Sequence, residues 1–392
     1  MELTEKQKQG LDIAVARYKA HEPWTCIAGY AGTGKSTLVQ HIIDALGINR
    51  NNVGYITFTG KAALVLRNKG CEDAMTAHRL LYESFPRKDG TFFHKPKRPL
   101  DKYYDLIVVD EVSMLPKPLW DLLLSHYIPV IALGDPGQLP PVGEANGVLD
   151  NPHVFLDEIM RQAEESEIIR LTMDIREGKP LNLYRGTEVM VIDKKEIHPG
   201  MYDWADQILC GKNATRHAIN NLMRERIFDI KSATTPPIDG DKVICLKNVW
   251  EPFNEVGDVL VNGMVGTIKN PVLHTGQPYV PNIVHANFIP EYYTDELIKE
   301  SPRDLVFRNL KMDYNIFANG EGYINNSNYK KIPSKFHPKQ FDYGYCITTH
   351  KSQGSEWNKV LVFEEYLRET DHSKWLYTAA TRAKERLIIV RA

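Results

Sequence analysis

Short apolar runs alternate with helix-like segments over the first 160 residues of the chain. The runs at 24–28, 53–58, 106–109 and 130–133 end in polar residues, and apolar positions at helical spacing follow at 37–43 and 61–68. Short apolar runs separated by helices are typical of parallel strands that are buried on both faces. This region is therefore predicted to be an α/β domain with functional residues at the carboxyl ends of its strands.

Residues 85–104 interrupt this pattern with the turn pair Asp89–Gly90, aromatic residues and a basic run. These features predict a β-hairpin inserted into the α/β domain. A second α/β set is predicted to begin near Ala205, with a strand at 207–210 and a helix at 215–228.

Residues 239–341 are rich in Val, Gly, Pro, Asn and Tyr and contain turn signals such as Val261–Asn262–Gly263. They predict a small all-β insertion. The pattern then returns to α/β, with predicted strands at 345–348, 359–363 and 387–390 and a helix at 374–381.

Composition narrows the class of protein. Hydrophobic content of 43% and charged content of 25% are ordinary for a globular protein, and no apolar run approaches the ~18 residues of a membrane span. The polar start MELTEKQKQG has no signal-peptide core. Five cysteines without C-x-x-C spacing argue against a zinc site and disulfides, and predict small buried side chains in a reducing cytoplasm. With a net charge of −2, any nucleic acid must bind a local positive groove.

The segment GYAGTGKS at 29–36 fits the phosphate-binding pattern G-x-x-x-x-G-K-[ST] between a predicted strand and a predicted helix. Glycines let the backbone N–H groups turn toward an anion, and the helix start adds its positive dipole end. Lys35 can reach terminal phosphates, and the Ser36 hydroxyl can ligate Mg²⁺. The predicted nucleotide-binding residues here are Gly29, Gly32, Thr33, Gly34, Lys35, Ser36 and Thr37.

Two further strand ends carry candidate chemistry. Asp110 can hold the Mg²⁺ shell, and Glu111 can orient and deprotonate an attacking water. Gln138, beyond the next strand, is a candidate sensor that touches both the γ-phosphate and that water. Phosphoryl transfer also needs mobile positive charge, for which Arg161 and Arg382 are the candidates.

Nine segments resemble the motifs of the superfamily 1 DNA helicases, in the 1B branch that includes RecD-like and Dda-like enzymes. The segments are Leu3–Thr4–x–x–Gln7, GYAGTGKS with DEVSM at 110–114, residues 57–63, residues 76–78, GDPGQLPPVG at 134–143, Arg161–Gln162, residues 347–356 and residues 377–384. The segment at 134–143 continues as Gln138–Leu139–Pro140–Pro141, which is similar to the 1B pattern of helicase motif III.

The resemblance implies roles for individual residues. Gln7 would read adenine, and the hydrolytic centre would contain Lys35, Ser36, Asp110, Glu111, Gln138, Arg161 and Arg382. Nucleotide contacts from a second motor domain would come from Gln353, Gly354 and Glu356. The strand-binding groove would be lined by Thr59, Lys61, Thr76, His78, Thr348 and His350.

The resemblance also implies the domain organisation. Two RecA-like P-loop domains would comprise 1–84 with 105–160 and 161–238 with 342–392, and 239–341 would be an SH3-like insertion. Residues 85–104 would form a pin or wedge at the fork. Phe92 and Phe93 would stack on a base, worth ~1–3 kcal/mol, or instead plug the hairpin onto the core. Lys95, Lys97 and Arg98 could meet phosphates.

The implied activity is ATP-dependent, 5′→3′ translocation on single-stranded DNA coupled to unwinding of forked duplex DNA. ATP and Mg²⁺ are the implied cofactors, a single-strand-binding or replication protein is a candidate partner, and the chain is implied to act as a monomer without nuclease activity. The expected location is cytoplasmic, in a bacterium or in the host cell of a phage. Two alternatives stay open. One is an RNA helicase or remodelling ATPase of the same branch. The other is a nucleotide-switched binding protein or P-loop kinase, which the segments at 347–356 and 377–384, similar to helicase motifs V and VI, disfavour.

Overall fold

The computed structural model describes residues 3–68, 70–86, 92–97, 100, 103–140, 144–158, 165–231, 235–249, 260–275, 282–291, 306–325, 338–368 and 371–392. Two compact units account for the fold. The first comprises Met1–Glu83, Lys95–Asp206 and Ser352–Ala392, and the second comprises Ser84–His94 and Gln207–Lys351. The boundaries given above for the two motor domains stay predictions.

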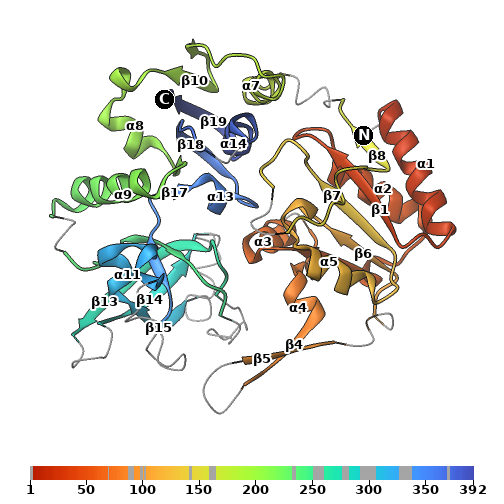
Figure 1. The fold of residues 1–392 in the computed structure, drawn as a ribbon, viewed down its shortest axis with the longest axis horizontal. Helices are drawn as coiled ribbons and strands as arrows, with labels where there is room; N and C mark the ends of the chain where they lie inside the picture. The colour runs from red at the N-terminus through yellow and green to blue at the C-terminus, as the bar shows by residue number, and fades with distance from the viewer. Residues whose placement is uncertain are drawn as a thin grey trace. The chain divides into compact units, whose positions relative to one another are not determined.

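A six-stranded parallel sheet forms the centre of the first unit, in the order β3-β2-β6-β7-β1-β8. Its strands β6, β7, β1 and β8 are labelled in Figure 1. Its strands are β1 (Trp24–Gly29), β2 (Val53–Thr57), β3 (Met75–Thr76), β6 (Leu106–Val109), β7 (Val130–Gly134) and β8 (Val154–Leu156). The four strands that were predicted here are confirmed. The two short outer strands, β3 and β8, were not predicted.

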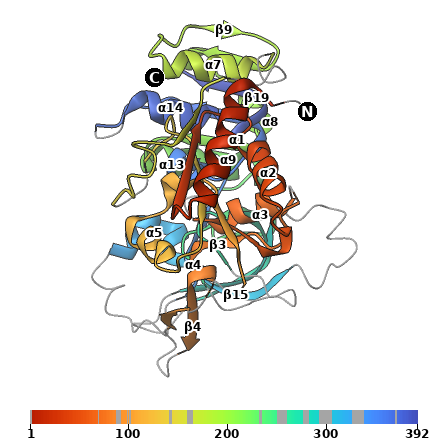
Figure 2. The same cartoon turned by 90° about the vertical axis from the view of Figure 1, so that its right-hand side faces the viewer.

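Alternating side chains bury both faces of this sheet, because strand residues point to opposite sides in turn. Ile27 and Leu133 join one core with α1 (Glu5–Lys19) and α2 (Lys35–Leu46), which lie side by side in Figures 1 and 2. Cys26 and Ala132 join the opposite core with α4 (Ala77–Leu81) and α5 (Lys117–Leu124). Helix α3 (Gly60–Asn68) follows β2, as the sequence predicted.

A second group of strands in the first unit has the order β18-β19-β10-β9. Strands β18 (Trp357–Phe363), β19 (Ala383–Val390) and β10 (Val189–Ile192) are parallel, and β9 (Tyr184–Arg185) is antiparallel to β10. The helices nearby in sequence are α7 (Glu167–Arg176), α8 (Pro199–Trp204) and α14 (His372–Ala380). The prediction that a second α/β set begins near Ala205 is wrong, because β10 precedes it as a run of four residues with apolar side chains.

The second unit contains β11 (Gln207–Cys210) paired in parallel with β17 (Cys346–Thr348), next to α9 (Asn213–Phe228). A five-stranded antiparallel sheet has the order β15-β14-β13-β12-β16. Its strands are β12 (Lys242–Cys245), β13 (Val265–His274), β14 (Ile283–Pro290), β15 (Phe307–Asp313) and β16 (Phe341–Tyr343). The predicted insertion is therefore a sheet, but not an all-β one, because α11 (Tyr314–Asn319) follows β15.

Helix α9 carries two arginines that are fully buried in the second unit. Arg224 pairs with Asp241 at 2.9 Å, and Arg216 pairs with Asp342 at 3.0 Å. A buried charge needs such a partner, and removal of one member of a buried pair typically costs about 3–5 kcal/mol. These pairs therefore join α9 to β16 and to the residue before β12.

Strands β4 (Tyr82–Pro86) and β5 (Phe92–Pro96) form a two-stranded sheet of their own. Only antiparallel strands can be joined by a connection as short as residues 87–91. The predicted hairpin is thus confirmed, although it begins at Tyr82 rather than Phe85.

Four cysteines are buried, as predicted, whereas Cys71 is partly exposed, so the prediction was wrong for that residue. Within the described ranges, no cluster of three or more His, Cys, Asp or Glu side chains could hold a metal ion. None of the helices in those ranges combines the length and the apolar character that crossing a bilayer requires.

Candidate nucleotide site

The phosphate loop lies between β1 and α2, as the sequence predicted. Gly32 and Gly34 have φ of 78° and 77°, in the left-handed region that favours glycine. A Cβ on Gly29 would lie 2.7 Å from Thr33 Oγ1 and 2.8 Å from the Leu156 carbonyl oxygen. The loop therefore depends on glycine for its turns at two positions and for close packing at a third.

The Lys35 ammonium group donates to the carbonyl oxygens of Gly29 at 2.7 Å and Tyr30 at 3.0 Å. Both acceptors are neutral carbonyls of the loop itself. Ionised phosphate oxygens are stronger acceptors for an ammonium group. The lysine thus lies where a triphosphate could take over its hydrogen bonds.

Gln7 ties the start of α1 to this loop. Its amide oxygen accepts from the Thr4 N–H at 3.0 Å, and the Thr4 hydroxyl accepts from the Gln7 N–H, which together make a capping box. Its Nε2 donates to the Thr33 carbonyl at 3.0 Å, and the side chain is 1% exposed. The geometry adds a structural role to the adenine-reading role that the resemblance implies.

Asp110 and Glu111 follow β6 at its carboxyl end. Glu111 has φ 51° and ψ 48°, a left-handed conformation that costs an ordinary residue about 1–2 kcal/mol. Its N–H donates to Asp110 Oδ1 at 2.9 Å. Strain of this kind is often retained at functional sites, where it aims a side chain.

The pKa of Glu111 is raised from its ordinary value, first by burial and then by the Asp110 carboxylate. Arg382 and Lys35 act in the opposite direction and favour the ionised form. The electrostatic field of Glu111 thus includes three of the residues that were predicted for the hydrolytic centre. A carboxyl with a raised pKa is suited to accept a proton from water near neutral pH.

Gln138 is buried beyond the end of β7, with its Nε2 3.5 Å from Glu111 Oε1. Its Oε1 is buried and has no hydrogen-bond partner among the described residues. An unpartnered buried acceptor is costly unless a ligand or water satisfies it. The Gln138 amide, whose Nε2 lies beside Glu111, thus fits a water molecule that attacks a phosphate.

Arg382 is 4% exposed and bonds to its own surroundings. Its guanidinium donates to the Thr378 carbonyl at 2.9 Å, the Ser355 carbonyl at 3.2 Å and the Thr381 hydroxyl at 3.0 Å. Arg161, the other predicted arginine, lies outside the described residues together with Gln162.

Arg176, at the end of α7, was not among the site residues predicted from the sequence. Its guanidinium carbon lies 3.6 Å from the centre of the Tyr30 ring, and Tyr30 in turn packs edge-on against Phe155. Tyr30 is the second residue of the phosphate loop, so a cation stands beside that loop. No motif marks Arg176 in the sequence, and only the fold brings it here.

These residues fit ATP with Mg²⁺. The loop offers glycine turns and Lys35. Glu111 and Gln138 offer a place for water, and Asp110 directly precedes Glu111 at the carboxyl end of β6. Mg²⁺ typically takes one or two carboxylates together with phosphate oxygens and water. Ser36, which is exposed at the start of α2, and Asp110 would supply the protein ligands.

Residues 353–356 lie in the first unit, near the loop that follows β7. Gln353 is buried, and its Nε2 donates to the Leu139 carbonyl at 3.0 Å. Glu356 pairs with Lys384 at 3.5 Å. Gly354 has φ 71°, and a Cβ there would lie 3.0 Å from Thr59 Oγ1. Their predicted contacts with nucleotide stay predictions.

The nucleic-acid candidates of the first unit gather where β2 and β3 end. Thr59 caps α3 by accepting from the Ala62 N–H, and Thr76 caps α4 by accepting from the Arg79 N–H. The partly exposed His78 ring stacks on Tyr82, with centroids 6.2 Å apart. The Lys61 ammonium lies 4.0 Å from the centre of the Trp357 ring.

In the second unit, Thr348 ends β17 and His350 lies in α13 (Thr349–Ser352). Thr348 is 8% exposed, and burial lowers the pKa of the His350 imidazole. A neutral imidazole can stack or donate one hydrogen bond, but it adds no positive charge for a phosphate backbone.

The hairpin presents Phe93, which is 46% exposed, and Lys95, which is exposed. Lys97 donates instead to the Arg79 carbonyl at 2.8 Å, and burial lowers its pKa. Phe92 begins β5, but its side chain lies outside the described part of the chain, as does Arg98.

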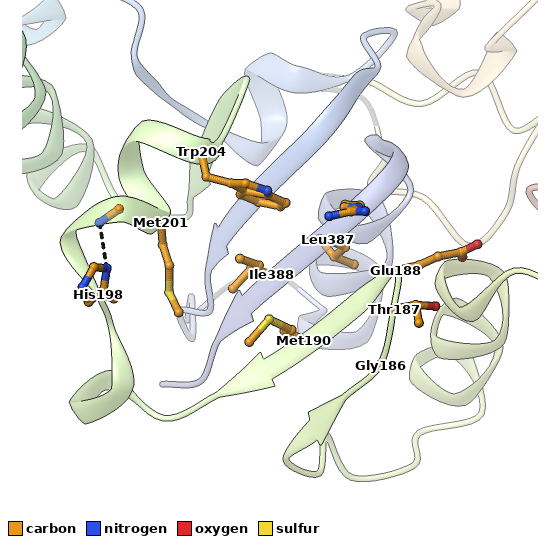
Figure 3. A pocket seen from close by; sticks show the side chains of 11 residues that line it. Gly186, Thr187, Glu188, Met190, His198, Met201, Trp204, Leu387 and Ile388 are labelled. Atoms are coloured by element: carbon orange, nitrogen blue, oxygen red, sulfur yellow. Dashed lines mark hydrogen bonds between the residues drawn. The ribbon is translucent and has the colours of Figure 1, made fainter.

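A separate cavity of about 360 Å³ lies against β10 and β19 in the first unit (Figure 3). Trp204, Met190, Met201 and Ile388 give it apolar walls, and His198 stands at one side with its Nδ1 accepting from the Gly200 N–H. None of the predicted site residues lines it. This cavity is therefore distinct from the predicted nucleotide site at the phosphate loop.

Two family matches cover most of the region that carries these motifs. Residues 2–194 match the family described as "AAA domain", and residues 343–390 match the family described as "UvrD-like helicase C-terminal domain". The ATP-dependent RecD2 DNA helicase of Deinococcus radiodurans is 28% identical, over 92% of this chain and 46% of that protein. The chain thus spans less than half of this relative.

Two other likenesses extend over nearly the whole chain. The ATP-dependent DNA helicase dda of Enterobacteria phage T4 is 23% identical over 98% of both chains. The solved structure of a Pif1 helicase from Bacteroides in complex with ADP-AlF3 and ssDNA has a TM-score of 0.52, 18% identity, and coverage of 99% of this chain and 92% of that chain.

The fold and the matches define a P-loop protein built from two RecA-like domains with insertions. The matched families, the relatives and the solved structures together support assignment of the chain to the superfamily 1B helicases.

Proposed function

We propose that this chain is an ATP-dependent DNA helicase that translocates 5′→3′ on single-stranded DNA and unwinds forked duplexes. The observation that carries the proposal is the cluster around Glu111. Asp110, Lys35 and Arg382 all shift the pKa of the Glu111 carboxyl, and the Gln138 amide lies beside that carboxyl. Such a cluster can position water against a terminal phosphate and stabilise the charge that develops. The likeness to DNA helicases supports coupling of this hydrolysis to movement on nucleic acid.

Direction and substrate class are tested with forked duplexes that have either a 5′ or a 3′ single-stranded tail. The proposal expects unwinding only with the 5′ tail, and unwinding restricted to the 3′ tail would reverse the assigned direction. Stimulation of ATPase activity by single-stranded DNA and by RNA of the same sequence separates DNA from RNA as the track. Hydrolysis that no nucleic acid stimulates would favour a nucleotide-switched protein or a kinase.

Phe93→Ala should reduce unwinding by about 5- to 20-fold, which corresponds to loss of one stacking contact of ~1–2 kcal/mol. Phe93 is 46% exposed in the hairpin, which is distant in sequence from the nucleotide cluster. ATPase activity stimulated by single-stranded DNA should stay within about twofold of wild type. Phe93→Tyr, which keeps a ring, serves as the matched control. Equal losses of unwinding and ATPase activity in Phe93→Ala would reject a wedge.

The ATPase rate should fall on acidification at a pH above the ordinary titration range of a glutamate. Glu111 must be ionised to accept a proton, and its pKa is raised by burial and by Asp110. A pH profile of kcat at saturating ATP measures this fall in rate on the acid side. Because the folded state holds this proton more tightly than the unfolded chain, ionised Glu111 opposes folding at neutral pH. Glu111→Gln should therefore be inactive yet no less stable, and a clear loss of Tm would contradict the raised pKa.

A further inference from the structure

The hydroxyl of Tyr377 bonds to two loops of the nucleotide site. Tyr377 lies in α14 and is 2% exposed. Its oxygen accepts from the Ala31 N–H at 3.0 Å and donates to Asp135 Oδ2 at 2.7 Å. Ala31 belongs to the phosphate loop after β1, and Asp135 directly follows β7, which pairs with β1. One hydroxyl thus joins the loops at the carboxyl ends of two neighbouring strands.

Asp135 in turn shapes the loop that carries Gln138. Its side chain is 2% exposed, and its Oδ1 accepts from the Gly137 N–H at 2.9 Å. A Cβ on Gly137 would lie 3.0 Å from a carbon of the Tyr377 ring, so the ring also packs directly on this loop. Gln138, with its amide beside Glu111, is the next residue. Its position therefore depends on the contact between Asp135 and Tyr377.

The same helix leads to Arg382. Thr378, the neighbour of Tyr377, accepts from the Leu139 N–H through its hydroxyl at 2.9 Å. Its carbonyl accepts from Arg382 Nε at 2.9 Å. Tyr377 and Thr378 thus bond to the two ends of the 135–139 loop. Thr378 also bonds to Arg382.

We propose that Tyr377 is a positioning residue for ATP hydrolysis, whose hydroxyl sets the spacing between the phosphate loop, the Gln138 loop and the segment that carries Arg382. The inference rests on the proposed ATPase activity and deepens it. Tyr377 need touch no reacting atom, since it acts through Ala31 and Asp135. Loss of its hydroxyl leaves the phosphate-loop glycines and Lys35 in place, so that alignment at the reacting phosphate suffers more than affinity for ATP.

Tyr377→Phe removes both hydrogen bonds and keeps the ring. The expected result is a kcat for DNA-stimulated ATPase about 10- to 100-fold below wild type, the scale that small misplacements produce. The KM for ATP should change by less than about threefold, which separates alignment from uniform binding. Asp135→Asn should lower kcat similarly. The double variant should be little worse than either single variant, because both changes break the same hydrogen bond between Tyr377 and Asp135.

Tyr345→Phe is a matched control with the same pair of bonds in the second unit. The Tyr345 hydroxyl accepts from the Lys242 N–H at 3.1 Å and donates to Asp241 Oδ1 at 3.0 Å. Tyr345→Phe should lower Tm as Tyr377→Phe does, with kcat within about twofold of wild type.

Three outcomes would overturn the role of Tyr377: an unchanged kcat in Tyr377→Phe, a KM that rises as much as kcat falls, or an equal loss of kcat in Tyr345→Phe. A Tyr377→Phe protein that does not fold leaves the decision to Asp135→Asn, for which a wild-type kcat would likewise overturn the role. A wild-type protein without ATPase activity would instead refute the proposed function.

Discussion

Lys35→Ala should lower the ATPase rate by at least about 10²–10³-fold, the loss typical when one preorganised electrostatic group is removed from a transition state. The ammonium group is held at the Gly29 and Tyr30 carbonyls, where it can move onto the terminal phosphates. Lys35 also favours the ionised form of Glu111. Its loss therefore removes the phosphate contact and also leaves less of Glu111 in the ionised form that accepts a proton. A DNA-stimulated ATPase assay measures the effect.

Lys117→Ala is the control, because Lys117 makes an exposed pair with Asp121 at 2.9 Å that contributes little to stability. Its ATPase rate should match wild type. Thermal unfolding of Lys35→Ala should shift little, since the lost hydrogen bonds are worth about 0.5–1.5 kcal/mol each. Turnover near the wild-type rate in a folded Lys35→Ala protein would refute the assignment of the nucleotide site.

Local patterns in the sequence predicted the parts of the fold that depend on neighbouring residues. The apolar runs of β1, β2, β6 and β7 were identified because buried parallel strands need no alternation of polar positions. The phosphate loop was identified because its glycines, lysine and serine are adjacent in the chain. The edge strands β3 and β9 are only two residues long, too short for any periodicity to mark.

Partnerships between distant segments could not be predicted. Nothing in the helical pattern of 215–228 distinguishes Arg224 from an exposed arginine, because its partner Asp241 lies 17 residues away and is brought near only by folding. The hydroxyl of Tyr377 is 346 residues from Ala31, and Arg176 reaches Tyr30 only through the placement of α7. The left-handed backbone of Glu111 is likewise set by its surroundings and not by its residue type.

Arg382→Ala should preserve ATP binding and lower the rate of hydrolysis on the order of 10³–10⁵-fold, as expected for an arginine that stabilises the transition state. Fluorescent-nucleotide binding and single-turnover hydrolysis measure the two steps separately. The substitution also removes the Arg382 hydrogen bonds to the Ser355 and Thr378 carbonyls, which costs stability, although the Thr378 carbonyl keeps the Thr381 hydroxyl as a donor. Arg382→Lys keeps the charge without the planar fork, so it should bind ATP and hydrolyse it slowly.

Arg386→Ala is the matched control for Arg382, since Arg386 is exposed four residues further along the same segment. Its rates should equal those of wild type. A second measurement separates chemistry from folding: Arg382 favours the ionised form of Glu111, so the pKa of Glu111 should rise further in Arg382→Gln. The residual hydrolysis of that variant should therefore lose activity at a higher pH than wild type does. An unshifted acid limb, or loss of ATP binding as large as the loss of hydrolysis, would mean that Arg382 supports the fold and does not act on the reacting phosphate.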